Sequence, residues 1–204
     1  MTTLVLATGN PHKVKELKAM LAPYAYELKL QTEFFTEEVE EDGYSFIENA
    51  LKKARYASKR TGLPALADDS GLEVDALMGA PGIYSARYSE GYLGQHASES
   101  LSNQKLLDEL QGLPYGKRQA CYYCAMVFVR HECDPTPLVG IGQWRGEILM
   151  QPKTQYGVGY DPIMWMPSHL KAASEIPMQV KNQVSHRAQA LRGVLAQLLQ
   201  VPQW

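Results

Sequence analysis

Residues 4–21, LVLATGNPHKVKELKAML, change from a strand pattern to a helix pattern at a single corner. An apolar run ends at residues 8–10, and from Pro11 onward the apolar side chains recur at helical spacing. Asn10 is a favourable helix N-cap, and proline is favoured in the first helical turn. The N-terminus therefore predicts a strand that leads directly into a helix.

Similar signals occur along the rest of the chain. Ser45 and Glu48 form a capping-box pattern, and Gly62 supplies a helix stop. In residues 64–77 we expect an apolar strand that ends at two aspartates, then a Ser-Gly corner and a second apolar segment. The predicted helices cover residues 11–21, 45–62, 98–110 and 185–200, and the other predicted strands cover residues 3–7, 119–130, 137–143 and 145–150. Because strands and helices alternate at both ends while strands cluster in the middle, the pattern indicates an α/β fold with a mixed sheet.

The totals exclude several classes of partner. A chain of 204 residues can bury one good core, or two small lobes that share one cleft. The formal net charge of -2 excludes general electrostatic binding of nucleic acid or an anionic membrane, so any bound anion needs a local pocket. No apolar run approaches the roughly 18 to 20 residues that span a bilayer, and the N-terminus lacks a signal-peptide pattern. We therefore expect a cytoplasmic protein.

The cysteines give little support for a disulfide or metal framework. Their number, three, is odd, which argues against a set of disulfides. Cys121, Cys124 and Cys133, with His131 nearby, faintly resemble zinc ligands. However, a separation of three along a strand places Cys121 and Cys124 on opposite faces, so buried, reduced thiols are the better interpretation.

The corner at residues 8–10 has the features of an anion site. A helix N-terminus presents free backbone N–H groups and a positive dipole end, and Gly9 allows close approach of a ligand. Lys13 and Lys15 lie in the first turns, where the helix dipole disfavours a cation unless an anion is bound. The alternative is an ordinary Asn-capped helix with solvated lysines, because the motif does not match the P-loop pattern.

Carboxylates form a second candidate site. Asp68 and Asp69 follow an apolar strand, and the carboxyl ends of strands are where α/β sheets bind ligands. Adjacent side chains on a strand point to opposite faces, so both aspartates need not enter one pocket. Repulsion between nearby carboxylates is relieved by a divalent cation. Glu40 and Glu41 would join the site only if the fold brings them there. The alternatives are turn chemistry for the aspartates and a solvated acidic loop for the glutamates.

Basic residues recur at a second predicted helix start. Ser185 is a good N-cap, and His186 and Arg187 follow it in the first turn, with Lys181 shortly before. The alternative is a capped helix with surface charges.

Taken together, anion-binding helix ends, basic side chains and a carboxylate cluster predict a Mg²⁺-dependent enzyme that acts on a phosphorylated small molecule.

Five ordered blocks resemble a known family: LATGNPHKVKEL, FIENALKKAR, ADDSGLEVDALMGAPGIYSARY, GYDPI and SHRAQAL. They resemble the non-canonical purine nucleoside triphosphate pyrophosphatases, which act on inosine and xanthosine triphosphates, and the resemblance runs from about residue 3 to residue 199. It implies a long twisted central sheet flanked by helices, in a single domain over residues 1–204 with two lobes around one nucleotide cleft. It also implies hydrolysis of ITP, dITP and XTP between the α and β phosphates, and a homodimer.

The resemblance also implies roles for individual positions. Thr8, Asn10 and Lys13 should bind the triphosphate, with Lys53 near the phosphates. Mg²⁺ would be held by Glu41, with neighbouring Glu40, and by Asp69. Asp69 is also the expected general base, with Asp68 in support. The full expected substrate-binding set is Thr8, Gly9, Asn10, Lys13, Lys53, Ser70, Val158, Gly159, Tyr160, Asp161, Lys181, His186 and Arg187.

One position departs from the family pattern. The family block usually reads Phe-Gly-Tyr-Asp, whereas this chain has Val158 in place of the phenylalanine. Because base stacking on an aromatic ring contributes on the order of 1 to 3 kcal/mol, base affinity is expected to fall unless Tyr160 or Trp165 compensates. Two alternatives stay open: a pyrophosphatase of the same fold for other modified nucleotides, and a nucleotide-binding sensor without turnover.

Overall fold

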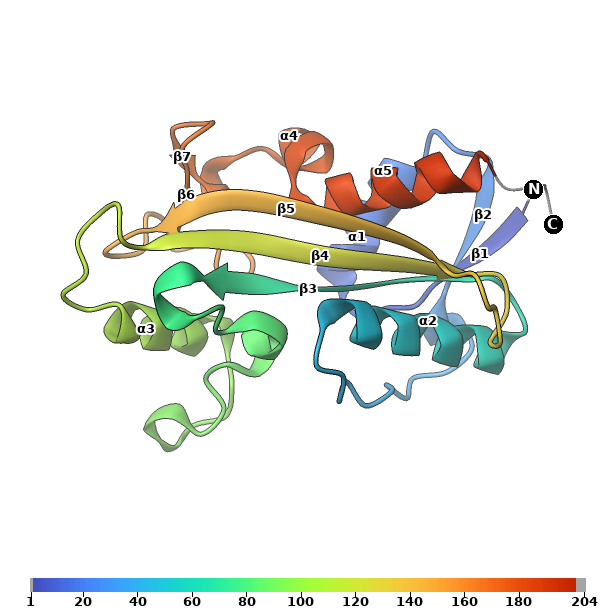
Figure 1. Ribbon diagram of the computed structural model, residues 1–204, viewed down its shortest axis with the longest axis horizontal. Coiled ribbons are helices and arrows are strands. Elements are labelled where there is room, and N and C mark those ends of the chain that lie inside the picture. The colour runs from blue at the N-terminus through green and yellow to red at the C-terminus, as the bar shows by residue number, and fades with distance from the viewer. Residues whose placement is uncertain (1, 201–204) are drawn as a thin grey trace. The chain divides into compact units, whose positions relative to one another are not determined.

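A mixed sheet of seven strands, in the order β2-β1-β3-β4-β5-β6-β7, organises the computed structural model, which describes residues 2–200 (Figure 1). β1 pairs in parallel with β2 and with β3, whereas β6 pairs in antiparallel orientation with β5 and with β7. The strands are β1 Thr2–Leu6, β2 Tyr26–Leu30, β3 Ala65–Val74, β4 Gln119–Val129, β5 Leu138–Ile148, β6 Met164–Met166 and β7 Lys171–Ala172. The predicted α/β fold with a mixed sheet flanked by helices is confirmed.

The helices begin and end where the sequence predicts. The side chains of Asn10, Ser45 and Ser185 cap α1, α2 and α5, and Gly62 ends α2 in the left-handed conformation with φ 68°. The helices are α1 Pro11–Leu21, α2 Phe46–Thr61, α3 Glu99–Glu109, α4 Met178–Val184 and α5 His186–Leu198. Helix α4 and the short strands β6 and β7 have no counterpart in the prediction. Within residues 2–200, no helix combines the length and apolar character needed to cross a membrane.

The chain divides into two compact units. The first comprises the chain up to Asp69, Cys124–Gly142 and the residues from Asn182 onward, and the second comprises Ser70–Tyr123 and Gln143–Lys181. Strands β3, β4 and β5 therefore contribute residues to both units. The expectation that residues 1–204 form a single domain stays a prediction.

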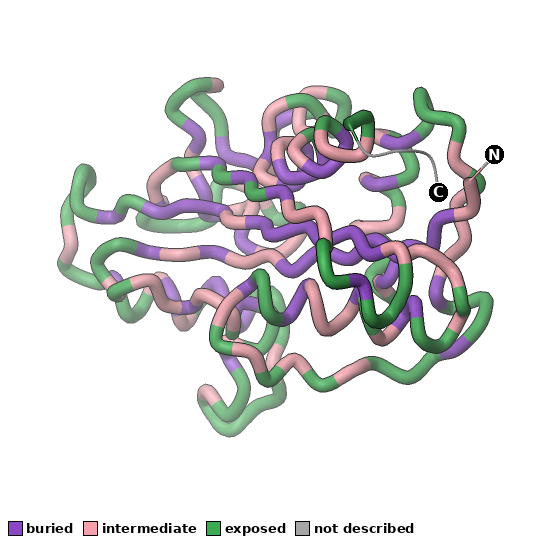
Figure 2. The backbone as a smooth tube through the Cα atoms, turned by 45° about the vertical axis from the view of Figure 1, so that its right-hand side comes forward, coloured by how far each residue is buried: buried purple, intermediate pink, exposed green. Residues whose placement is uncertain are grey.

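The core of the first unit follows the alternation of side chains along its strands. Leu4 and Leu6 of β1 and Leu66 of β3 pack with α1 and α5 on one face of the sheet. On α2, which lies on the opposite side in Figure 1, Ala50 and Ala54 are fully buried. Figure 2 shows buried residues along the strands and exposed residues in the connecting loops. The β3 residues of the first unit therefore face α1 and α5 or face α2 according to their parity.

The expected corner after Asp69 is wrong, because β3 runs without a break from Ala65 to Val74. In its second half, the Leu72 N–H donates to Ser85 Oγ at 2.8 Å, and the Val74 N–H donates to Ala80 O at 3.1 Å. These partners satisfy the backbone in an extended conformation, which overrides the local turn preference of Asp, Ser and Gly. The aspartates therefore lie in the middle of a strand and not at its carboxyl end.

The predicted strands 137–143 and 145–150 are one strand, β5 Leu138–Ile148. Buried and exposed residues alternate through Trp144, which is itself buried, so the pattern has no interruption there. Buried thiols are confirmed for Cys121 and Cys124, whereas Cys133 is exposed. On α5, the apolar side chains of Leu191, Val194 and Leu195 are buried.

Helix α5 lies unusually close to β5, because glycines form the contact. A Cβ atom on Gly142 would lie 1.9 Å from His186 O and 2.8 Å from Ala190 N, and one on Gly140 would lie 2.0 Å from Ala190 O. Both neighbours are backbone atoms, which cannot rotate away. The close approach fixes the start of α5 against the sheet.

Replacing Gly142 by alanine is expected to destabilise the fold by about 1–3 kcal/mol, because the added methyl group forces the helix and strand apart. Urea unfolding of both proteins measures this difference. The control is Ile141→Ala, since Ile141 is 39% exposed on the other face of β5. That variant should lose less than about 1 kcal/mol. Equal losses in the two variants would contradict the proposed close packing.

Candidate active site

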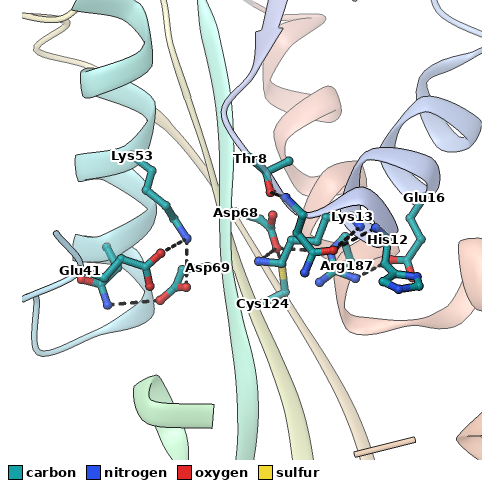
Figure 3. Close-up of polar contacts among 12 residues, drawn as sticks. Thr8, His12, Lys13, Glu16, Glu41, Lys53, Asp68, Asp69, Cys124 and Arg187 are labelled. Carbon is teal, nitrogen blue, oxygen red and sulfur yellow. Dashed lines mark hydrogen bonds and ion pairs between the residues drawn. The ribbon is translucent and has the colours of Figure 1, made fainter. Parts of the chain in front are cut away.

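Asp68 and Asp69 are consecutive residues of β3, and their side chains point to opposite faces of the sheet (Figure 3). Asp68 shares the face of Leu66 and meets residues of α1 and α5. Asp69 points the other way, toward α2. The prediction that the two carboxylates need not share one pocket is confirmed, and each has its own set of partners.

Asp68 joins two helix starts that lie far apart in the sequence. Its Oδ2 lies 3.0 Å from Lys13 Nζ of α1 and 3.2 Å from Arg187 Nε of α5. Arg187 also pairs with Glu16 of α1. The cations that the helix dipoles disfavour at these positions are therefore compensated by carboxylates of the protein itself.

The Asp68 carboxylate is a permanent anion. Its side chain is fully buried. Burial alone would raise the pKa of Asp68, but Lys13, Arg187 and Lys53 outweigh it and hold this pKa well below its usual value. Cys124 Sγ lies 4.0 Å from Oδ2, and burial together with the Asp68 charge raises the pKa of that thiol, so it stays protonated. Asp68 is suited to holding Lys13 and Arg187 and not to exchanging protons.

Asp69 lies in a different electrostatic environment. Its Oδ1 lies 3.1 Å from Lys53 Nζ, and its Oδ2 accepts a hydrogen bond from Asn49 Nδ2 at 3.3 Å. Lys53 Nζ also lies 3.0 Å from Glu41 Oε1. Burial raises the pKa of Asp69, and the charge of Glu41 adds to this, while Lys53 and Lys13 oppose it. Of the two aspartates, Asp69 is therefore the one suited to accept a proton.

Glu41 and Asp69 meet around one cation position, which Lys53 Nζ occupies. Mg²⁺ is commonly held by one or two protein carboxylates together with phosphate oxygens and water, so this pair fits its requirements. Glu40 is exposed, and it is Glu41 that contacts Lys53. Among residues 2–200, no group of three or more His, Cys, Asp or Glu side chains is arranged to hold a metal. A divalent cation here would need ligands from a bound substrate.

At the opening corner, the side chain of Asn10 is used by the protein. Its Oδ1 accepts hydrogen bonds from the backbone N–H groups of His12 at 2.9 Å and Lys13 at 3.3 Å. The backbone N–H of Asn10 donates to Thr8 Oγ1 at 3.1 Å. The expectation that these first-turn N–H groups are free is therefore wrong. Gly9 is exposed, and a Cβ atom there would lie 3.2 Å from Glu38 Oε1.

The remaining predicted site residues lie in the second unit, except His186, the first residue of α5. Ser70 follows Asp69 on β3. In residues 158–161, Gly159 O accepts a hydrogen bond from Asn103 Nδ2 at 3.0 Å, and the Tyr160 hydroxyl donates to Ser85 O at 2.8 Å. Because Tyr160 is only 5% exposed, it offers little ring surface for stacking on a base.

Sequence reasoning missed several contributors. Asn49 could have been found, because it lies four residues before Lys53 on the same face of α2. Glu16 and Cys124 contact the site only through the tertiary fold. Tyr122 and Asn103, which hold residues 158–161, also leave no local pattern in the sequence.

The chain is similar to known proteins over nearly its whole length. The sequence model of the Ham1 family matches residues 4–197. The chain belongs to the Ham1 family. Two similar proteins are named dITP/XTP pyrophosphatase. The one from Yersinia pseudotuberculosis is 53% identical over 195 residues, which cover 96% of this chain and 97% of that protein. The one from Photobacterium profundum is 48% identical over 198 residues, which cover 97% and 98%.

The fold of this Ham1-family chain also matches a solved structure. A HAM1 protein from Coxiella burnetii is 42% identical and superimposes with a TM-score of 0.87, covering 98% of this chain and 100% of that one. The expected family is therefore confirmed over nearly the whole chain.

The two aspartates should differ sharply in their effect on stability. Asp68→Asn is expected to cost about 3–5 kcal/mol, because it leaves Lys13 and Arg187 without their buried counter-charge. Asp69→Asn should stay within about 1 kcal/mol of wild type, since the raised pKa means that folding disfavours the ionised form, which asparagine removes. Urea unfolding of both variants measures the contrast.

The pH dependence gives a further check on Asp68. A lowered folded pKa gives stability that is fully present above the unfolded value of about 3.9 and lost only as pH falls through the folded value. The difference between wild type and Asp68→Asn should therefore be constant from about pH 8 to about pH 5. A difference that disappears on acidification over this range contradicts the assignment.

Proposed function

We propose that this protein hydrolyses ITP, dITP and XTP between the α and β phosphates, releasing the nucleoside monophosphate and pyrophosphate. The observation that carries the proposal is the convergence of Glu41 and Asp69 on one cation position, while Asp68 on the opposite face holds basic residues at two helix starts. The names of the similar proteins from Yersinia pseudotuberculosis and Photobacterium profundum support the substrate class.

In this proposal, residues of the first unit bind the triphosphate. Lys13 is held by Asp68 with its side chain 18% exposed, so it is oriented and still accessible to phosphate oxygens. Thr8, Gly9 and Asn10 bind beside it, and Lys53 contributes a second ammonium group. Two lysines neutralise negative charge that develops on the departing pyrophosphate.

Asp69 is the proposed general base. It accepts a proton from the attacking water, and Asn49 fixes the direction of its Oδ2 by a hydrogen bond. Asp68 supports this chemistry by fixing Lys13 and not by taking the proton. Mg²⁺, held by Glu41 and Asp69 with Glu40 beside them, would neutralise phosphate charge and align the triphosphate.

The base and sugar are proposed to contact Ser70, residues 158–161, Lys181 and His186. Hypoxanthine and xanthine carry an oxygen at the purine 6-position, whereas adenine carries an amino group. Hydrogen-bond donors such as Lys181 and His186 favour the oxygen and oppose the amino group. Because Arg187 is already paired with Asp68 and Glu16, we assign it to ordering α1 and α5 and no longer to the base.

Because Val158 replaces the phenylalanine of the family pattern, one alternative stays open, namely a pyrophosphatase of the same fold for other modified nucleotides. The deciding experiment incubates the protein with Mg²⁺ and, separately, ITP, XTP, dITP, ATP and GTP, and measures pyrophosphate and orthophosphate. Pyrophosphate from ITP, dITP or XTP supports the proposal, and chelation by EDTA should abolish its release. Orthophosphate release, or ATP as the best substrate, rejects it, and binding without turnover would indicate a sensor.

A cytoplasmic homodimer is part of the same proposal and is tested by cell fractionation and light scattering.

Replacing Asp69 by asparagine should lower kcat by about 10²–10⁴-fold, because a neutral amide cannot accept the proton. Nucleotide binding, measured by isothermal titration, should persist. Asp42→Asn is the matched control, since Asp42 directly follows Glu41 in the sequence, is exposed and pairs with Lys52. It should leave kcat within about twofold of wild type. Activity of Asp69→Asn above about a tenth of wild type would remove this residue from the role of base.

A further inference from the structure

The carboxylate of Asp161 receives a donor on each of its oxygens. The Tyr122 hydroxyl donates to Oδ1 at 3.0 Å, and Lys181 Nζ pairs with Oδ2. All three residues belong to the second unit. Asp161 therefore links a residue of β4 to a residue of α4, and it does so within the segment proposed to face the purine base.

The backbone around Asp161 is fixed by other contacts. The Asn103 side chain donates to the backbone carbonyl of Gly159, and the Tyr160 hydroxyl donates to the backbone carbonyl of Ser85. What remains to be set is the rotation of the Asp161 carboxylate. A carboxylate rotates about a broad, roughly two-fold torsion, so a donor on one oxygen determines where the other oxygen points.

Tyr122 is a rigid donor. It is only 7% exposed, and its ring stacks on Trp144 with centroids 6.3 Å apart and an interplanar angle of 29°. Burial and the neighbouring Asp161 charge raise the pKa of its hydroxyl well above the ordinary value, so the proton stays in place. The hydroxyl has a single proton, and that proton goes to Asp161.

Lys181 retains donors for a ligand. An ammonium group carries three N–H donors, and the pairing with Asp161 occupies one of them. Its side chain is 13% exposed, so the group is partly accessible. A lysine stem is long and flexible, and without Asp161 the ammonium would be distributed over many positions.

We propose that Tyr122 is a positioning residue for substrate selection: through Asp161 it holds the Lys181 ammonium where it donates to the 6-oxygen of the purine. This inference rests on the proposed function, and it extends that function by naming a residue that the family resemblance does not supply. Because the contact concerns the base and not the reacting phosphate, its loss should affect binding and selectivity more than the chemical step.

Tyr122→Phe removes the hydroxyl and keeps the ring stacked on Trp144. The KM for ITP is expected to rise about three- to tenfold, in line with the loss of one hydrogen bond of typical net strength. The kcat should stay within about twofold, and the preference for ITP over ATP in kcat/KM should fall by a factor similar to the KM change. Tyr92→Phe is the matched control, because its hydroxyl also donates to a carboxylate of the second unit, that of Asp108, which has no part in the proposed function. It should leave KM, kcat and selectivity unchanged.

A double-mutant cycle separates positioning from a general structural effect. If Tyr122 acts through Lys181, Tyr122→Phe should have no further effect on KM or selectivity in a Lys181→Met background. Asp161→Asn is a second test, because it weakens the interactions of residue 161 with both Tyr122 and Lys181. It should also raise KM with kcat nearly constant. Thermal unfolding of each variant confirms that the fold is intact.

The inference is overturned if Tyr122→Phe leaves KM and selectivity unchanged, if it lowers kcat alone, or if its effect is additive with Lys181→Met. If Tyr122→Phe fails to fold, the KM of Asp161→Asn tests the inference in its place. An unchanged KM in Asp161→Asn also overturns the inference. Failure of the proposed function looks different, since wild-type protein would then release orthophosphate in place of pyrophosphate, act best on ATP, or bind nucleotide without turnover.

Discussion

The arrangement of the site depends on the two-residue repeat of a β-strand. Because β3 continues through Asp68 and Asp69, adjacent acids face opposite sides of one sheet, and each meets a different layer of helices. A corner at this point would have left both carboxylates in one solvated loop. The strand instead gives them separate environments from nearly identical sequence positions.

The two environments shift the acids in opposite directions. Basic side chains from α1 and α5 surround Asp68, so its charge is fixed, whereas Asp69 faces Glu41 as well as Lys53 and ionises less readily. Pairs of titratable groups driven apart in this way are typical of sites that need one fixed charge and one proton acceptor. The geometry thus gives neighbouring residues different electrostatic properties without reference to the family.

Local signals in the sequence predicted much of the fold. Asn10, Ser45 and Ser185 start helices as expected, because a capping side chain acts on the backbone within three residues of itself. The prediction of secondary structure failed where contacts between residues far apart in the sequence determine the backbone conformation. Ser70 and Gly71 favour a turn locally, but β3 finds partners at Ser85 and Ala80 and stays extended. In the candidate site, motifs singled out Lys13, Glu41 and Asp69, whereas the roles of Glu16 and Tyr122 arise only from tertiary contacts.

The cluster around Asp68 also bears on how the protein is made. Arg187 lies 119 residues after Asp68 and 171 residues after Glu16, yet it pairs with both. Since a ribosome delivers the chain from its N-terminus, Glu16 and Asp68 emerge long before the arginine that pairs with both of them. A nascent chain therefore holds an incomplete charge cluster for most of its synthesis, and Glu16 and Asp68 meet Arg187 only as the last helix leaves the exit tunnel.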